Sequence, residues 1–476
     1  MCRTSVLSAD TFARYSRARG FNSLYIGVEN CTPQELCDRY YAIHAAVYKW
    51  FNISFDIFGR TTTPLQTEIT QDIFLKLKDN GFLEERMTTQ LCCEQHHSFL
   101  ADRFVEGECP DCGYVNVRGD QCDLCGKLLE SLELIRPRCK VDGSVPITKE
   151  TKHIFLELDK LQPEVEAFFQ ESAAKGAWSS NGTSIIAAWL KEGLQPRSIT
   201  RDLKWGTPVP TSLEGYEEKV IYSCQLHRPM GEVVAQPRRR AALPIHGKDN
   251  VVYHSIIFPA TKIGTHEPWT KLHHLFTIDY LTYEGGKFSK SRGIGVFGDS
   301  ARETEVPSDI WRFYLLYCRP EIGDSEFTWD GFISANNNLL LKNLGNFVSR
   351  VVKFINSRHF NNVVPDWTQY GESSFDAFKA NINQLLAQYI QELDRVKLRA
   401  GLLTALQISQ RGNGFLQASK LDNSLYETQP AKCAAIIGLA INLVHLLASL
   451  ISPYMPTTAA AINSQLRANE LPILED

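Results

Sequence analysis

The spacing of hydrophobic residues changes along the chain, and its first part predicts a mixed α/β structure. Residues 1–85 alternate helix-like and strand-like stretches: a helix that Ser8 caps, a strand at 21–26, and a helix that Pro33 opens and that ends at Trp50. Helices that alternate with strands are typical of a parallel sheet. The N-terminal stretch is also rich in Arg and poor in acids, so a mitochondrial transit peptide is the alternative there.

Between residues 91 and 145 the regular spacing of hydrophobic residues disappears. Seven of the 13 cysteines fall within residues 92–139. Thiols that cluster in a large chain are typical of metal ligands rather than of disulfides. We therefore predict a small, metal-stabilised insert in a larger α/β domain, whose mixed pattern returns at 154–317.

Four of these cysteines form two pairs with the spacing of zinc knuckles. Two residues separate Cys109 from Cys112 and Cys122 from Cys125, and a glycine follows each pair. This spacing lets both sulfurs of a pair face one ion, and four thiolates suit tetrahedral Zn²⁺. Because no ligand position is left open for a substrate, we predict one structural zinc. Unligated thiols or a redox pair are the alternative.

A second metal site is a weaker hypothesis. Cys93 and His96 precede the two knuckles, and Cys139 and Asp142 follow them, again with two residues between the members of each pair. All four side chains can bind zinc, but the mixture of donors is unusual. The alternative is a loop that binds no metal.

The last part of the chain has a helical pattern throughout. Apolar residues recur at spacings of four and three, which predicts an amphipathic helix with Asn343, Asn346 and Arg350 on another face. Further helical stretches at about 374–410 and 430–451 predict an all-α bundle. The apolar stripe of the first helix consists of Leu340, Leu344, Phe347, Val351 and Phe354.

Residues 433–451 are nearly all apolar and approach the length that spans a membrane. Asn442, His445 and Ser449 interrupt the segment, so we predict a helix buried among other helices and no membrane partner. The whole chain carries 50 Lys and Arg against 54 Asp and Glu, a formal net charge of −4. This balance excludes a globally basic nucleic-acid coat, and any contact with nucleic acid has to be local.

A glycine-flanked segment at 284–293 combines basic and hydroxyl side chains that could neutralise a triphosphate, although a solvated basic loop has the same composition. Its KFSKS sequence, residues 287–291, resembles the Lys-Met-Ser-Lys-Ser signature of class I aminoacyl-tRNA synthetases. The surrounding chain resembles the methionyl-tRNA synthetases, in their eukaryotic cytosolic form. The blocks that carry this resemblance are 6–26, 50–63, 99–107, 199–208 and 309–320.

The resemblance implies a Rossmann-type α/β catalytic domain in two parts, 1–88 and 149–330. Between them lies a zinc-binding connective insert, 89–148, and after them an all-α anticodon-binding domain, 331–476. It also implies that ATP, with Mg²⁺, activates L-methionine to methionyl-adenylate, which is then transferred to tRNA(Met) in the cytoplasm. Membership in a multi-synthetase assembly stays open.

The family's motifs also imply roles for residues at matching positions. The alternatives are surface ion pairs for Arg201 and Asp249, and a packed core imidazole for His254. The implied roles are catalysis for Lys287 and Lys290; ATP binding for Lys287, Ser289, Lys290, Ser291 and Asp249; methionine binding for Arg201 and His254; anticodon reading for Asn346 and Arg350; and zinc binding for Cys109, Cys112, Cys122 and Cys125.

The chain departs from the family at four places. A His-Ile-Gly-His signature is expected just before Val6 and a Gly-Thr-Asp-Glu-Tyr-Gly-Thr stretch between Ile26 and Thr32, yet the sequence has neither. Residues 223–246 replace an aromatic methionine pocket, and no tryptophan stands near Leu421 to stack on the anticodon. Phosphate positioning and substrate orientation each contribute several kcal/mol, so we expect the printed chain to be severely impaired. It is an incomplete version of an active ligase or, alternatively, a non-catalytic protein that binds tRNA or partner proteins.

Overall fold

The structure is a computed structural model that describes most of the chain. Several predicted features lie outside the described residues: the helix at Ser8, the strand at 21–26 except Ile26, the ligands His96, Cys122 and Cys125, the atypical segment up to residue 244, and the KFSKS segment at 287–291. The described residues are 26–29, 34–60, 63–95, 97–100, 104–118, 129, 131–176, 178–203, 205–221, 245–269, 272–286, 295–296, 298–357, 359–366, 370 and 375–473.

Short parallel strand pairs form the centre of the α/β body. They join β1 to β2, β13 to β14 and β15 to β16. Parallel strands need a crossover connection, and α2 lies between β1 and β2 and ends at Trp50, as the sequence predicts. The parallel pairing confirms the predicted α/β character. The bounds are β1 (Ile26–Glu29), α2 (Gln34–Trp50), β2 (Ile57–Arg60), β13 (Ile245–Gly247), β14 (Phe276–Ile278), β15 (Leu281–Tyr283) and β16 (Ser325–Phe327).

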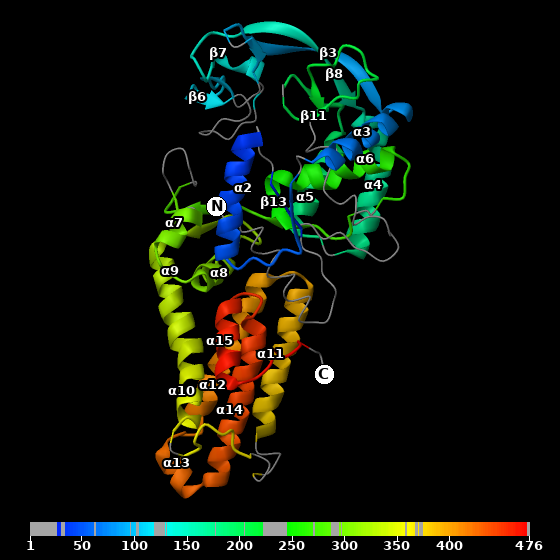
Figure 1. The fold of residues 1–476 in the computed structure, drawn as a ribbon. Helices are drawn as coiled ribbons and strands as arrows, with labels where there is room; N and C mark the ends of the chain where they lie inside the picture. Colours follow the sequence, from blue (N-terminus) through cyan, green and yellow to red (C-terminus); the bar gives the residue numbers. More distant parts are fainter. Residues whose placement is uncertain are drawn as a thin grey trace.

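Four helices pack around an apolar core of their own within this body (Figure 1). Ile73, Phe74 and Leu77 of α3 and Leu161 and Val165 of α4 are fully buried there. Their spacing of three and four residues places them on one face of each helix, which explains why the helices pack by that face. The helices are α3 (Pro64–Asp79), α4 (Leu158–Lys175), α5 (Ser180–Glu192) and α6 (Phe258–Gly264).

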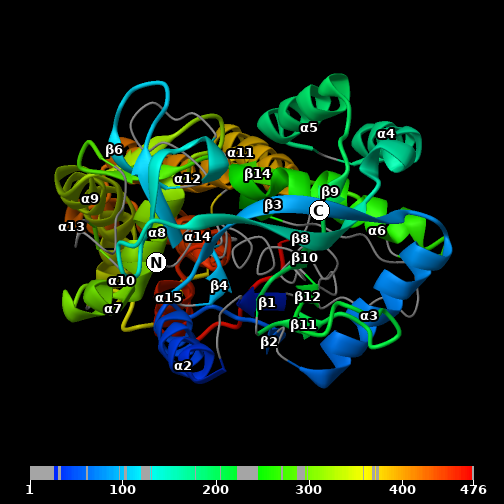
Figure 2. The same cartoon turned by 90° about the horizontal axis from the view of Figure 1, so that it is seen from above.

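Two long antiparallel strands carry the cysteine-rich insert. β3 and β8 pair from Leu83 opposite Leu156 to Cys92 opposite Ile147, and Figure 2 shows them side by side. The insert then forms a small sheet in the order β6-β5-β7. Its core is small and includes the buried Cys93, Cys109 and Cys139. The bounds are β3 (Leu83–Cys93), β4 (Ser98–Phe99), β5 (Val105–Glu108), β6 (Val115–Arg118), β7 (Ile135–Cys139), β8 (Ile147–Leu156) and a 3-10 turn (Ser131–Glu133).

The C-terminal part is helical, as predicted, and forms the opposite end of the molecule from the insert (Figure 1). The predicted stretch at 374–410 is wrong in one respect, because it is two helices, α11 and α12. The chain turns between them at Val396, whose φ is 57°. The helices are α7 (Gly298–Glu303), α8 (Ser308–Tyr317), α9 (Trp329–Ala335), a π-helical stretch (Asn336–Gly345), α10 (Asn346–Ile355), α11 (Asp376–Asp394), α12 (Leu398–Ala418), α13 (Asn423–Thr428), α14 (Pro430–Ile451) and α15 (Pro456–Leu466).

Among the described residues, one helix, α14, is long and apolar enough to cross a membrane by length and composition. In the structure, 72% of the most apolar 18-residue stretch of this helix is buried inside the protein. It contacts α10, α12, α13 and α15, and Cys433, Ile436 and Val444 are fully buried. The prediction of a core helix among other helices is confirmed.

Candidate functional site

Polar side chains gather where β13 and β14 end. Gly247 lies opposite Ile278 at the ends of the two strands, and Lys248 and Asp279 are the next residues of each. The Lys248 Nζ lies 3.1 Å from Asp279 Oδ1 and 2.8 Å from Asp324 Oδ1. Burial by itself would lower the pKa of Lys248, but the hydrogen bonds to the two carboxylates outweigh it and raise that pKa. The carboxyl edge of parallel strands is where α/β folds place ligands.

The backbone of Asp249 lies in a 3-10 turn, Lys248–Asn250, directly at this edge. Its side chain lies outside what the structure describes. The predicted ATP contact of Asp249 therefore has a matching backbone position and stays a prediction.

His254 lies in a π-helical turn, Tyr253–Ile257, that continues into α6. Such turns are rare and often occur at functional sites. His254 is half-buried rather than packed in the core, whereas Ser255 behind it is fully buried. Arg197 holds the start of the turn, because its Nη2 donates to the Tyr253 hydroxyl at 3.3 Å and its guanidinium lies 5.5 Å from the centre of the Tyr253 ring.

Arg201 lies on β10, four residues after Arg197, and is half-buried. Its Nη1 donates to the Ser198 carbonyl at 3.1 Å, to Ser198 Oγ at 3.0 Å and to the Thr200 carbonyl at 2.8 Å. Arg201 thus contacts Ser198, and Arg197 on the same short strand as Ser198 contacts the π-helical turn that carries His254.

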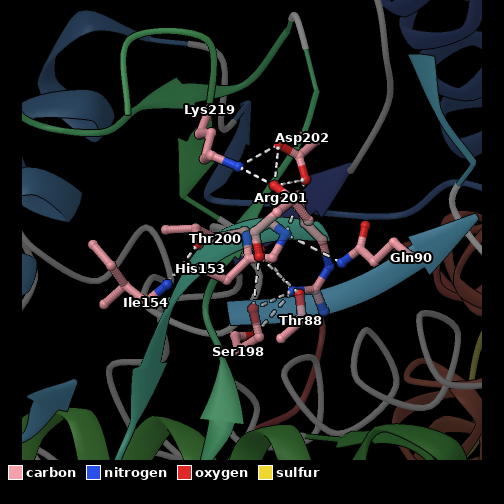
Figure 3. Close-up of polar contacts among 10 residues, drawn as sticks. Thr88, Gln90, His153, Ile154, Ser198, Thr200, Arg201, Asp202 and Lys219 are labelled. Atoms are coloured by element: carbon pink, nitrogen blue, oxygen red, sulfur yellow. Dashed lines mark hydrogen bonds and ion pairs between the residues drawn. The ribbon is translucent and has the colours of Figure 1, made fainter. Parts of the chain in front are cut away.

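A buried polar network lies next to Arg201, and Figure 3 shows it. His153 of β8 is fully buried; its Nε2 lies 2.9 Å from Asp202 Oδ2, and its Nδ1 lies 3.0 Å from Thr200 Oγ1. Lys219 donates to Asp202 from the other side and to Thr151 Oγ1 at 2.6 Å. Burial would raise the pKa of Asp202, but the hydrogen bonds from His153 and Lys219 outweigh it and lower that pKa to about 2. Asp202 is therefore ionised at neutral pH.

Strand pairing explains how this network assembles. β10 (Thr200–Arg201) pairs with β12 (Val220–Ile221), which places Asp202 and Lys219 at the same end of the ladder. β9 (Arg197–Ser198) pairs with β8, which carries His153. The third strand of the small sheet is β11 (Thr207–Pro208). His153 and Lys219 carry no sequence motif, so reasoning from the sequence missed them.

The KFSKS segment begins directly after a tight turn at the end of β15. Tyr283 and Gly286 exchange backbone hydrogen bonds of 2.8 and 2.9 Å, and Gly285 has a φ of 79°, which favours glycine. The Gly285 N–H donates to Glu326 of β16. Lys287, Ser289, Lys290 and Ser291 themselves lie outside the described residues, so their roles stay predictions.

Two turns in the insert have the same hydrogen-bond pattern. At Cys109, the Gly113 N–H donates to the Cys109 carbonyl at 3.0 Å, and the Cys109 N–H donates to Tyr114 at 3.0 Å. At Cys139, the Gly143 N–H donates to the Cys139 carbonyl and the Cys139 N–H donates to Ser144, both at 2.8 Å. The two glycines also share a positive φ, 69° at Gly113 and 74° at Gly143.

Each turn presents two of the predicted metal ligands. The first turn contains Cys109, which is fully buried, and Cys112, which is exposed. Cys122 and Cys125 lie outside the described residues, so the four-cysteine site is described only in half. The two-residue spacing within this turn is the one found in zinc knuckles.

The second turn meets β3 and forms a cluster of three metal-ligand types. The Sγ atoms of Cys93 and Cys139 and a carboxylate oxygen of Asp142 lie within 4.8 Å of one another. Cys93 Sγ is 3.6 Å from Asp142 Oδ2. Hydrogen bonds from the backbone and hydroxyl of Ser144 keep the pKa of Asp142 well below its usual range, so it is ionised. His96, the fourth predicted ligand, lies outside the described residues.

The predicted anticodon-reading residues lie on α10, in the helical end of the molecule (Figure 1). Asn346 and Arg350 are both exposed, while Leu340, Leu344, Phe347 and Val351 are buried. The predicted stripe is thus confirmed except for Phe354, which is half-buried.

Two other predictions concern the helical end: the exposed position of Asn343 and the segment near Leu421 that has no tryptophan. Asn343 does not share the exposed face, because it is half-buried and its Nδ2 donates to the Leu406 carbonyl of α12 at 2.9 Å. At the place where a stacking tryptophan is missing, Leu421 is half-buried. Asp422 caps α13 there by accepting from the Leu425 N–H at 2.8 Å. The residues around Leu421 therefore lead into the N-terminus of α13.

Comparisons with known proteins define first the class of fold. A solved Mycobacterium tuberculosis methionyl-tRNA synthetase in complex with methionyl-adenylate superimposes with a TM-score of 0.76, covering 96% of this chain and 89% of that chain. At 18% sequence identity this likeness shows the fold alone, which is that of a class I synthetase with a C-terminal helical domain.

Sequence comparisons define the family. The model described as "tRNA synthetases class I (M)" matches residues 2–224 and 235–352, and the model "Anticodon binding domain of methionyl tRNA ligase" matches residues 364–476. The chain belongs to the methionyl class I tRNA synthetases.

Curated relatives include the cytoplasmic methionine–tRNA ligases of Saccharomyces cerevisiae (47% identity over 98% of this chain and 66% of the relative) and Homo sapiens (45% over 97% and 54%). A probable cytoplasmic methionine–tRNA ligase of Schizosaccharomyces pombe is 50% identical over 98% of this chain and 63% of its own length. The chain thus spans about half to two thirds of the length of these relatives.

The comparisons also bear on the predicted departures from the family. The first family model skips residues 225–234, inside the atypical segment. The alignment with the S. cerevisiae relative runs over 495 positions, 19 more than the 476 residues of this chain. At least that many aligned positions of the relative have no counterpart in this chain.

Proposed function

We propose that this chain acts in methionine–tRNA ligation. ATP, bound with Mg²⁺, would activate L-methionine to methionyl-adenylate, and the methionyl group would then pass to tRNA(Met). Family membership over nearly the whole chain carries the proposal, and the relatives' names support a cytoplasmic location. The contacts of Arg201 with Ser198, and of Arg197 on the same strand with the turn that carries His254, support a methionine site near these residues.

Methionine-dependent exchange of pyrophosphate into ATP tests the activity. For this chain we expect exchange with methionine and none with leucine, at a rate at least about tenfold below that of the S. cerevisiae relative, because residues 27–31 and 223–246 do not match the substrate-orienting segments of the family. Exchange within tenfold of that relative would mean that the departures do not matter. If methionine neither exchanges nor binds in equilibrium dialysis, the proposed activity is wrong, and tRNA or partner binding is the function that remains.

We propose further that the insert binds two structural zinc ions. The Cys109 turn would supply two thiolates of the first site, completed by Cys122 and Cys125. Cys93, Cys139 and Asp142, with His96, would hold the second. The shared hydrogen-bond pattern of the two turns supports a second knuckle whose final cysteine is replaced by aspartate. Zinc there would fix the small insert core, which has few apolar residues of its own.

Metal analysis of the purified chain tests both sites separately. We expect about two equivalents of zinc, with one lost in Cys122→Ser and the other in Cys139→Ser, since each change removes one ligand. Cys318→Ala is the matched control, because this half-buried thiol lies outside the insert and should leave both ions in place. One equivalent that survives Cys139→Ser would eliminate the second site, and less than half an equivalent would eliminate both.

A further inference from the structure

Lys262 of α6 lines a cleft whose residues do not include those of the polar cluster at Lys248. The cleft has a volume of about 370 Å³ and lies between α4, α6 and the loop that follows α6. Phe168, Ile263 and Trp269 give it apolar walls. Acidic side chains stand around it, and the remaining lining residues are Glu164, Ala167, Glu171, His266 and Glu267.

The amine of Lys262 is in an unusual environment for a lysine. The residue is 8% exposed, and its Nζ lies 3.7 Å from the centre of the Trp269 ring and 5.2 Å from that of Phe258. Within the described part of the chain, no hydrogen bond or ion pair reaches this Nζ. The nearby carboxylates of Asp72 and Glu267 are instead paired with Lys76, at 2.6 and 2.7 Å.

Burial destabilises the ammonium form of Lys262. Burial is the largest effect and lowers the pKa of Lys262 to about 8; Lys76 acts in the same direction, and Glu267 and Asp72 oppose it. The other titratable groups that line the cleft are Glu164, Glu171 and His266. A neutral primary amine is a nucleophile, and near neutral pH a larger fraction of Lys262 than of an exposed lysine is in that form.

We propose that Lys262 is an acylation site, at which the amine takes an uncharged acyl group from an activated carboxylic acid such as a thioester or a mixed anhydride. The Nζ lone pair attacks the carbonyl carbon, and a new N–C bond forms. The bond from that carbon to sulfur or oxygen breaks, the leaving group departs with the electron pair, and the amine proton passes to water. Phe168, Ile263 and Trp269 would contact the acyl chain.

The charges around the cleft select acylation among the reactions open to an amine. An amide is neutral, so the burial that disfavours the ammonium favours this product. An imine would carry a positive charge again on protonation, and a carbamate would place an anion beside Glu164, Glu171 and Glu267. The same carboxylates should disfavour an acyl group that carries its own negative charge.

Competitive labelling of the intact chain tests the proposal. Trace acetic anhydride is applied over a series of pH values, and acetylation of each lysine is read by mass spectrometry. At about pH 8, half of the Lys262 amines should be neutral against well under 1% for an ordinary lysine, so we expect labelling at least about tenfold faster than at Lys353 even after allowing for burial. Lys353 is the matched control because it is an exposed lysine on α10. Lys262→Arg should remove the labelled site without changing the rate at Lys353.

A second arm compares acyl groups. With succinic anhydride in place of acetic anhydride, the ratio of labelling at Lys262 to that at Lys353 should fall severalfold, and the surface change Glu164→Gln should partly restore it. Labelling of Lys262 that is slower than that of Lys353 at this pH, and fast only in urea, would show a buried structural lysine and overturn the proposal. A succinyl ratio equal to or above the acetyl ratio would overturn the preference for an uncharged acyl group.

Discussion

The ionised Asp202 should stabilise the protein in a way that depends on pH, and Asp202→Asn removes that contribution. The carboxylate binds His153 at 2.9 Å and Lys219 from the other side, and the side chains of Asp202 and Lys219 are 14% and 10% exposed. Asparagine keeps the shape and an acceptor oxygen but has no charge. Lys219 would then be a nearly buried cation without its charged partner.

Two estimates give the size of the effect. The pKa of Asp202 falls from 3.8 to about 2, and at about 1.36 kcal/mol per unit this corresponds to roughly 2.4 kcal/mol at neutral pH, which we reduce to about 1–2 because the carboxylate is partly hydrated. Removing one member of a buried ion pair costs about 3–5 kcal/mol. We expect Asp202→Asn to lower the free energy of unfolding by about 2–3 kcal/mol, between the two estimates.

The sign of the pH dependence is fixed by the direction of the pKa shift. A carboxyl group whose pKa is lowered on folding stabilises the protein above its unfolded pKa, near 3.9, and this stabilisation is lost as the pH falls toward 2. The difference between wild type and Asp202→Asn should therefore be largest near neutral pH and smaller by about 1 kcal/mol near pH 3.

Urea unfolding at several pH values, followed by circular dichroism, measures this difference. Asp79→Asn is the control, because Asp79 is an exposed carboxylate at the end of α3 and should give a small change that does not vary with pH. A wild-type minus Asp202→Asn difference that stays constant from neutral pH to about pH 3 would refute the argument that the charge of Asp202 is the stabilising element.

Two further predictions concern the helical end and the junction of the domains. Arg350→Ala should weaken binding of tRNA(Met) by about 1–3 kcal/mol and affect a tRNA with a scrambled anticodon much less, since base contacts specify. Filter binding near physiological salt measures this, with Lys353→Ala on the same helix as control; equal losses on both tRNAs would show that α10 reads no bases. Arg312→Met should lower the free energy of unfolding by more than about 3 kcal/mol, because a buried charged donor to three carbonyls is removed. Urea unfolding tests this against the exposed Arg411→Met, and a loss similar to that of the control would contradict it.

The parts of the fold that the sequence predicts well are those whose pattern is local. The stripe with Leu340, Leu344, Phe347 and Val351 repeats every three or four residues, so one helix face is fixed by neighbours in the sequence. The break at Val396 was missed because apolar residues continue through it; the backbone turns there without Gly or Pro, with a φ of 57° at a β-branched residue. Tertiary packing of α11 on α12 sets that turn, and a single sequence carries no signal for it.

In the candidate sites, too, the sequence predicts the residues that belong to a local pattern and misses those that strand pairing brings together. Cys109, Cys112, Cys139 and Asp142 were predicted from short spacings, and the structure adds that both turns share one hydrogen-bond pattern. Cys93 lies on β3 and Cys139 at the end of β7, and the two cysteines come together near the end of the β3–β8 pair. This contact depends on strand pairing over a long sequence distance, which no local pattern reveals. His153 and Lys219 reach Asp202 only through the pairing of β8 with β9 and of β10 with β12, so they could not be found from the sequence.

The α/β body and the helical bundle are joined through hydrogen bonds of α8. Arg312 of α8 is fully buried and donates to the carbonyl of Phe51 at the end of α2, and to those of Pro453 and Tyr454 between α14 and α15. Asp309, one turn earlier, caps α15 by accepting from the N–H and hydroxyl of Thr458. The Arg312 guanidinium thus donates to carbonyls of both the α/β body and the helical bundle. A movement of one part against the other would break one of these hydrogen bonds and leave a carbonyl without this donor. Figure 1 shows α8 at this junction, between α2 and α15, so Arg312 ties the end of α2 to the connection between α14 and α15.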